Sequence, residues 1–179
     1  MNFRVRSFLP PLLAAGLLSA CGGGVSFSFV DDDGDDFFDL PFRSGRPAFA
    51  TVSAASDARL DGRYASDDAR LTHVFRFRAR GSTPETCRFQ FEGLRQPATD
   101  AFMSGEIQYL PGTDNLFASF FVVEGREFRV DGNNGVRLDR ASNSIVYQGA
   151  VLASTQGTGQ TITLDGSIPM RNEDKPSGC

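Results

Sequence analysis

The residues best suited to covalent chemistry in this chain are its three cysteines, Cys21, Cys87 and Cys179. A thiol accepts a lipid group, acts as a nucleophile when its pKa is lowered, or joins a second thiol in a disulfide. None of the three has the Cys-x-x-Cys spacing of redox and zinc motifs. The segments around them must therefore decide which chemistry each one performs.

Acid–base or metal chemistry through histidine would depend on His73, because the chain has one histidine. In an alternating strand His73 shares the inward side with Leu71 and Phe75, so a pocket histidine is one interpretation. We favour the other, a hydrogen-bonded histidine at a strand end or in the core, because no partner residue is indicated. The sequence contains no G-x-S-x-G, H-E-x-x-H or phosphate-binding glycine loop. We expect no enzyme and no cofactor.

Six aspartates lie in the run Asp31–Asp39, and carboxylates of this kind suit calcium. An EF-hand loop that starts at Asp31 would need glycine at its sixth position and glutamate at its twelfth, where this chain has Asp36 and Phe42. The run therefore fails the motif. We expect a solvated acidic segment and no metal site.

A basic row, Arg76, Arg78 and Arg80, alternates along the outward side of the same strand, with Arg88 nearby. Together with His73 these arginines are weak candidates for ligand binding, for lipopolysaccharide phosphates or an acidic partner. The alternative is that they keep a sheet face soluble. From Arg46 onward fifteen basic residues face sixteen acidic ones, so no nucleic-acid partner is expected.

The first twenty residues have the layout of a signal peptide. Arg4 and Arg6 precede the apolar run Phe8–Leu18, and the small residues Ser19 and Ala20 follow. The run is too short to cross a membrane as a helix, which needs about 20 apolar residues. We therefore assign residues 1–20 to an export signal.

Leu18-Ser19-Ala20-Cys21 resembles the lipobox of bacterial lipoproteins. The resemblance implies that Cys21 receives a diacylglycerol, becomes the first residue after cleavage and is then acylated. Several acyl chains anchor a protein stably, at about 0.8 kcal/mol per buried methylene. Because Gly22 and not aspartate follows Cys21, the resemblance points to the outer membrane of a Gram-negative bacterium. The alternative is an ordinary signal peptide that leaves Cys21 a plain thiol.

If Cys21 carries lipid, Cys87 and Cys179 remain. Export favours oxidation, and one disulfide between them is the simplest outcome. Two free thiols, or pairing between chains, are the alternatives. The bond would hold the segment around Cys179 against the body of the protein.

Hydrophobic residues after Phe49 recur with a period of two, typical of half-buried strands. The clearest pair is Leu71–Ala79 and Cys87–Glu92, separated by a turn at Gly81 and Pro84. One-turn helices, if present, are expected around Gln96–Ala101. Further strands are expected near Phe102–Leu110, Leu116–Val123, Glu127–Val130, Val136–Arg140, Ile145–Leu152 and Thr161–Met170, with one or two more in residues 49–54 and 61–66.

These elements predict an all-β protein, an antiparallel meander of about eight to ten strands that forms a small barrel or a sandwich. We expect a lipid-anchored acidic tether at residues 21–46 and a single β domain at residues 47–179. The expected function is a non-enzymatic binding or interaction module at the cell envelope. Its partner would be an apolar ligand inside the sheet or an envelope protein outside it. A purely structural envelope lipoprotein is the main alternative, and an envelope hydrolase has the least support.

Overall fold

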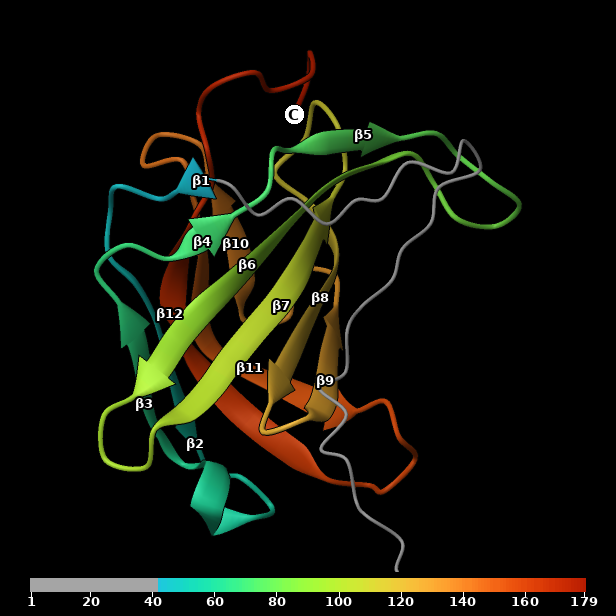
Figure 1. Cartoon of the computed structure of the whole chain (residues 1–179). Helices are drawn as coiled ribbons and strands as arrows, with labels where there is room; N and C mark the ends of the chain where they lie inside the picture. The colour runs from blue at the N-terminus through green and yellow to red at the C-terminus, as the bar shows by residue number, and fades with distance from the viewer. Residues whose placement is uncertain (1–41) are drawn as a thin grey trace, which may run out of the picture.

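The computed structural model describes residues 42–179, which form one antiparallel sheet (Figure 1). Nearly all of its regular structure is extended, so the all-β prediction is confirmed. The strands are β1 (Phe42–Arg43), β2 (Ala48–Ser53), β3 (Gly62–Ser66), β4 (Arg70–Leu71), β5 (Phe75–Phe77), β6 (Thr86–Gln96), β7 (Ala101–Tyr109), β8 (Leu116–Val123), β9 (Arg126–Asp131), β10 (Val136–Asp139), β11 (Ser144–Ser154) and β12 (Thr161–Pro169).

Eight of these strands close into a barrel, which settles the choice between barrel and sandwich. The pairing runs β6–β3–β2–β12–β11–β9–β8–β7, and β7 pairs again with β6. The remaining strands extend its rim: β1 pairs with β4, β4 and β5 pair with β6, and β10 pairs with β11. Closure leaves no long unpaired edge in the barrel wall, which protects a sheet against strand addition.

The alternation of side chains sets the two faces of the wall. In β7, Met103, Ile107 and Tyr109 are buried inside the barrel, and Phe102 at the opposite parity is 47% exposed. The hairpin between β8 and β9 uses Glu124 and Gly125 as its two central residues, both with positive φ. A two-residue turn of this kind matches the twist of the flanking strands.

Aromatic and aliphatic side chains fill the barrel interior. The register aligns Phe91, Gly105, Phe121 and Phe128 in one row across β6, β7, β8 and β9. The ring of Phe121 meets that of Phe91 at 5.3 Å between centroids, and that of Tyr147 at 5.1 Å. Other fully buried large side chains are Tyr64, Tyr109, Phe89, Leu71, Leu94, Met103, Ile107, Ile145 and Leu152.

The buried tyrosine hydroxyls of the barrel interior each have a hydrogen-bond partner. The Tyr147 hydroxyl donates to Ser119 Oγ at 2.9 Å, and the Tyr64 hydroxyl donates to the Leu60 carbonyl oxygen at 2.9 Å. Burial raises the pKa of Tyr147 far above its ordinary value, so this hydroxyl keeps its proton. A packed interior with paired polar groups is a core and not an open ligand cavity.

The strand predicted at Leu71–Ala79 is interrupted, and this part of the prediction is wrong. Thr72 Oγ1 accepts the Gln90 amide at 2.9 Å and so takes over a position of the ladder. The alternation of inward and outward side chains shifts by one residue at Thr72, so that Val74 is buried in the core. His73, Phe75 and Phe77, expected inside, are only half-buried outside the barrel.

The segment after β12 crosses the barrel end at which β6 begins and is fastened there by a disulfide. Cys87 and Cys179 form the predicted bond, with their Cα atoms 5.7 Å apart. The Tyr109 hydroxyl donates to the Cys179 oxygen at 3.0 Å, and Arg76 Nη1 donates to the Ser177 oxygen at 2.9 Å. We call residues 170–179 the strap.

Two smaller predictions also need correction. Phe42 pairs with Leu71, so the β domain begins before residue 47. The one-turn helix lies at Ala58–Leu60, with the Asp57 carboxylate accepting the Arg59 amide, and a turn occupies residues 97–100 instead. No helix within residues 42–179 is long and apolar enough to span a membrane.

Candidate functional site

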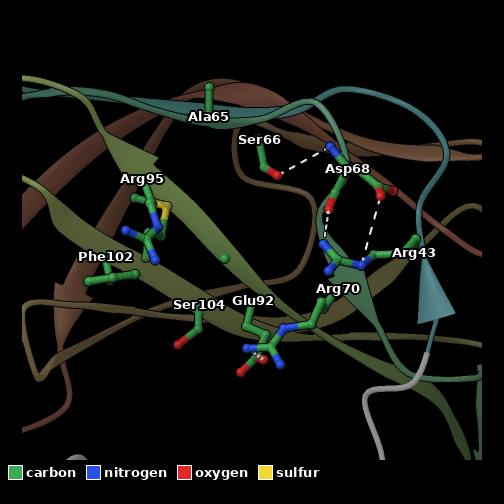
Figure 2. Close-up of a pocket in the computed structure, with 11 residues that line it drawn as sticks. Arg43, Ala65, Ser66, Asp68, Arg70, Glu92, Arg95, Phe102 and Ser104 are labelled. Atoms are coloured by element: carbon green, nitrogen blue, oxygen red, sulfur yellow. Dashed lines mark hydrogen bonds and ion pairs between the residues drawn. The ribbon is translucent and has the colours of Figure 1, made fainter.

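A groove of about 550 Å³ lies on the outside of the barrel, where β6 leaves β4 and joins β3 (Figure 2). A register shift in β6 between Phe91 and Leu94 bends the wall at this point. Ala65 and Gly93 contribute little side chain to this part of the wall. We call this site the outer groove. It is lined by Arg43, Ala65, Ser66, Asp68, Arg70, Glu92, Gly93, Arg95, Phe102, Met103 and Ser104.

Ion pairs form two sides of the outer groove. Arg70 pairs with Glu92 across β4 and β6, where the register places them opposite each other. Arg43 Nη1 donates to the Asp68 carbonyl oxygen at 3.3 Å, and its Nε lies 3.8 Å from the Asp68 carboxylate. The side chains of Arg43, Asp68 and Arg70 are well exposed, and that of Glu92 is half-buried. Such pairs contribute little to stability but present donors and acceptors to a partner.

An arginine–phenylalanine stack forms the third side. Arg95 and Phe102 face each other across β6 and β7, and the Arg95 guanidinium carbon lies 4.3 Å from the ring centroid. Arg95 also pairs with Asp100 at 3.1 Å. Phe102 is one of two large hydrophobic side chains that the described residues expose strongly, the other being Val151 on β11. An exposed aromatic ring beside arginines is typical of binding hot spots.

Sequence reasoning missed the outer groove. Arg43, Arg70, Arg95 and Phe102 are spread over some sixty residues and meet only because of strand register. The available signal was Phe102 itself, a large aromatic residue at the outward parity of its strand. Its neighbours follow only from the β6–β7 pairing, which the alternation pattern does not supply.

The predicted basic row is not a continuous free surface. Arg76 Nε donates to Glu85 at 2.7 Å, and the guanidinium of Arg88 lies over the Phe77 ring, 4.5 Å from its centroid. The Glu85 charge also interacts with Arg78. Arg80 lies in a short bridge with Thr83 beyond the end of β5. These arginines lie around β5, on the far side of β4 from the outer groove.

His73 lies against aromatic rings. Its imidazole packs edge-on against Phe42 at 4.2 Å between centroids, and against Phe75 at 6.2 Å. Neither ring can exchange a proton with it. Among residues 42–179 no cluster of three metal-ligating side chains occurs. The Asp31–Asp39 run and Cys21 lie outside the described residues.

A second pocket, of about 480 Å³, is lined by Phe42, Arg46, Asn143, Met170 and Arg171. Arg46 donates to the carbonyl oxygens of residues 142, 143 and 170, at 2.5, 2.9 and 3.1 Å. Arg171 stacks on Phe42 at 3.4 Å. These contacts fasten the strap and β1 to the barrel rim, so we assign this pocket a structural role.

We call the outward face of β6, β7, β8 and β9 the outer wall. Polar side chains on this face, such as Glu106 and Gln108, are unusually buried. One row of directly opposed residues crosses all four strands: Gln90, Glu106, Phe120 and Arg129. Glu106 accepts hydrogen bonds from the side-chain amides of Gln90 and Gln108. Burial raises the pKa of Glu106, against the opposing effect of these bonds and of the Arg88 charge.

This carboxyl predicts a pH effect on stability. Because the folded-state pKa of Glu106 is raised, its stabilising contribution is complete below the ordinary value of 4.5 and is lost as pH rises through the folded value. Glu106→Gln removes the ionisable group and therefore the loss of stability that its ionisation causes as pH rises. We expect the variant to have a higher urea midpoint than the parent at pH 7 and the same midpoint at pH 4. A lower midpoint at pH 7 would contradict the assignment.

No protein-family model, curated protein or solved structure matches this chain. Its function therefore has to be inferred from its own residues.

Proposed function

We propose that this chain is a lipid-anchored, non-enzymatic interaction module of the cell envelope, and that it binds an envelope protein through the outer groove. The observation that carries the proposal is the contrast between the two sides of the barrel wall. The inside is filled with buried rings, while the outside presents a groove lined by arginines and an exposed phenylalanine.

The interior argues against carriage of an apolar ligand. An eight-stranded barrel has just enough room for its side chains or for one small ligand. Here Phe91, Phe121 and Tyr147 contact one another across the barrel, and Gly105 is required where β7 faces them. A guest would have to displace these rings, at a cost comparable to opening a core.

The chemistry of the outer groove suits a protein partner. Arginine and aromatic side chains dominate the energetics of protein interfaces, and Arg95 and Phe102 form such a pair at the groove edge. Figure 2 shows the carboxylate of Asp68 beside Arg43 and that of Glu92 beside Arg70, so charges of both signs line the groove. Charges of both signs fix the orientation of a partner more than they raise its affinity.

The proposed location at the cell envelope rests on the resemblance of residues 18–21 to a lipobox. Lipid attachment at Cys21 would leave the barrel on a segment of about twenty residues that contains Gly22–Gly24 and the acidic run. Labelling with radioactive palmitate should give a labelled protein whose label is lost in Cys21→Ala. An unlabelled parent protein would refute the anchor.

The binding proposal is tested in intact cells with a photoreactive side chain. Phe102 is replaced by p-benzoylphenylalanine, and Val151, which is also strongly exposed but lies across the barrel on β11, provides the matched control. We expect one discrete light-dependent adduct from position 102 and none from position 151. Arg70→Glu, combined with the photoreactive group at position 102, should reduce the adduct at least tenfold.

The absence of an adduct from position 102 would count against an outer-groove partner. An adduct of the same mass from position 151, or one that Arg70→Glu does not change, would show non-specific contact and would also refute the proposal.

A further inference from the structure

The outer wall has more apolar character than a solvent-facing sheet surface requires. Strand β8 reads LFASFFVV, so both of its faces are largely apolar. The residues Ala118, Phe120 and Val122 have outward parity, since their neighbours Ser119, Phe121 and Val123 face the core. A sheet with one face in water normally carries polar residues at such positions.

The same residues are covered. Ala118 is 0% exposed and Val122 is 9% exposed, while the outward polar side chains Glu106 and Gln108 are 6% and 5% exposed. Phe102, at the same parity of β7 but near its start, is 47% exposed. The cover is therefore confined to the part of the wall centred on the row that contains Glu106 and Phe120.

We propose that the outer wall is the docking site for a segment of this same chain, Val25–Val30, whose sequence is VSFSFV. The segment alternates apolar and small polar residues, with Val25, Phe27 and Phe29 on one side. That pattern presents two aromatic rings to Ala118, Val122 and Phe120, where the Arg129 guanidinium also lies over the Phe120 ring, 5.1 Å from its centroid. The serines face outward.

The length of chain available fits this occupant. The described chain starts at Phe42 in β1, two strand positions from β6 through β4. Strands lie about 4.8 Å apart, so β8 is roughly 20 Å from β1 around the wall. The twelve residues from Val30 to Phe42 span up to about 40 Å when extended, so the segment reaches the wall without strain.

Charge supports the same path. The aspartates of the Asp31–Asp39 run follow the segment directly. Arg76 lies on β5, Arg78 follows β5, and Arg88 lies near the start of β6, the strand between β4 and β7; of these, Arg76 is already paired with Glu85. Acidic residues beside this basic group gain favourable interactions, and the bound segment itself carries no charge to desolvate.

Docking of Val25–Val30 would shorten the free segment between the proposed lipid site and the barrel. A free segment from Cys21 to Phe42 would hold the barrel at up to about 70 Å from its anchor. A docked Val25–Val30 leaves only Gly22–Gly24 between the proposed lipid site and the barrel. The outer wall would then face the membrane and the barrel would have one preferred orientation. This consequence depends on the proposed anchor, whereas the docking does not.

The test uses the full chain with p-benzoylphenylalanine in place of Phe120, and with the same group in place of Val151 as the matched control. We expect an intramolecular cross-link from position 120 into the peptide that contains residues 25–30, mapped by mass spectrometry, and no such link from position 151. Phe27→Asp combined with Phe29→Asp should reduce the yield at least tenfold without lowering the thermal midpoint of the barrel.

Three outcomes would overturn the proposal. The first is no link from position 120 to residues 25–30. The second is a link of unchanged yield in the double aspartate variant. The third is a link that forms between two molecules or to another protein, which would assign the outer wall to a different partner. Because this test does not involve Phe102 or Arg70, its failure is separate from failure of the outer-groove proposal.

Discussion

Replacing both Cys87 and Cys179 by alanine is expected to lower the free energy of unfolding by about 4 kcal/mol. The disulfide closes a loop with a sequence separation of 92 residues. In the chain-entropy model, a loop of this length contributes between 4 and 5 kcal/mol, roughly, by restricting the unfolded chain. The double replacement leaves no unpaired cysteine at either position, so it avoids the buried free thiol that a single replacement would create.

The loss should be measured by urea denaturation of the full chain. Reduction of the parent protein with dithiothreitol should give the same midpoint as the double variant. Without the bond, the end of the strap is held only by non-covalent contacts, such as the hydrogen bonds that Tyr109 and Arg140 donate to the oxygen of residue 179. Limited proteolysis should therefore cut near residue 175 before it cuts the barrel. A loss below about 1 kcal/mol would contradict the importance we give to the disulfide.

The second large effect is expected from Gly105→Ala, a change of one methyl group. A β-carbon at position 105 would lie 2.3 Å from the Phe120 carbonyl oxygen and 2.8 Å from two ring carbons of Phe91. The first neighbour is backbone and cannot rotate away. Overpacking of a filled core costs typically 1–3 kcal/mol, and we expect about 3 kcal/mol here.

Ser104→Ala is the matched control, because Ser104 precedes Gly105 in β7 and points outward. It should change the free energy of unfolding by no more than about 0.5 kcal/mol. If Gly105→Ala were as stable as the control, the rings of Phe91 and Phe121 would have room to move, and the interior could accept a guest.

The strands were largely predictable because their signal is local. Leu116–Val123 has the predicted bounds, and the period-two pattern correctly placed Phe89 and Phe91 inside. The break at Thr72 was not predictable, because it depends on a side-chain bond to Gln90, eighteen residues away. That single bond moves His73 and Phe75 from the inside to the outside of the barrel.

The disulfide was predictable by counting cysteines once Cys21 was set aside, whereas the candidate site was not. The outer groove requires the β6–β7 and β4–β6 registers, which bring Arg95 to Phe102 and Arg70 to Glu92. Register over such separations is set by the closed barrel as a whole. For the same reason, the burial of Glu106 on an outward face could not be read from its strand.

The two faces of the barrel wall differ in their side chains and in the roles we assign to them. The inner face supplies stability through packed aromatic rings, and the disulfide fastens the strap at the end at which β6 begins. The outer face carries the groove and the covered wall. Under the two proposals, one outer surface binds a partner and the other holds the chain's own tether.

Titration of the full chain with an apolar fluorescent probe, N-phenyl-1-naphthylamine, tests most directly whether the interior is filled and recognition is external. The account predicts no saturable rise in fluorescence with the folded protein. Saturable binding at one site, abolished by Ile107→Trp inside the barrel, would contradict it and would identify the protein as a carrier of an apolar ligand.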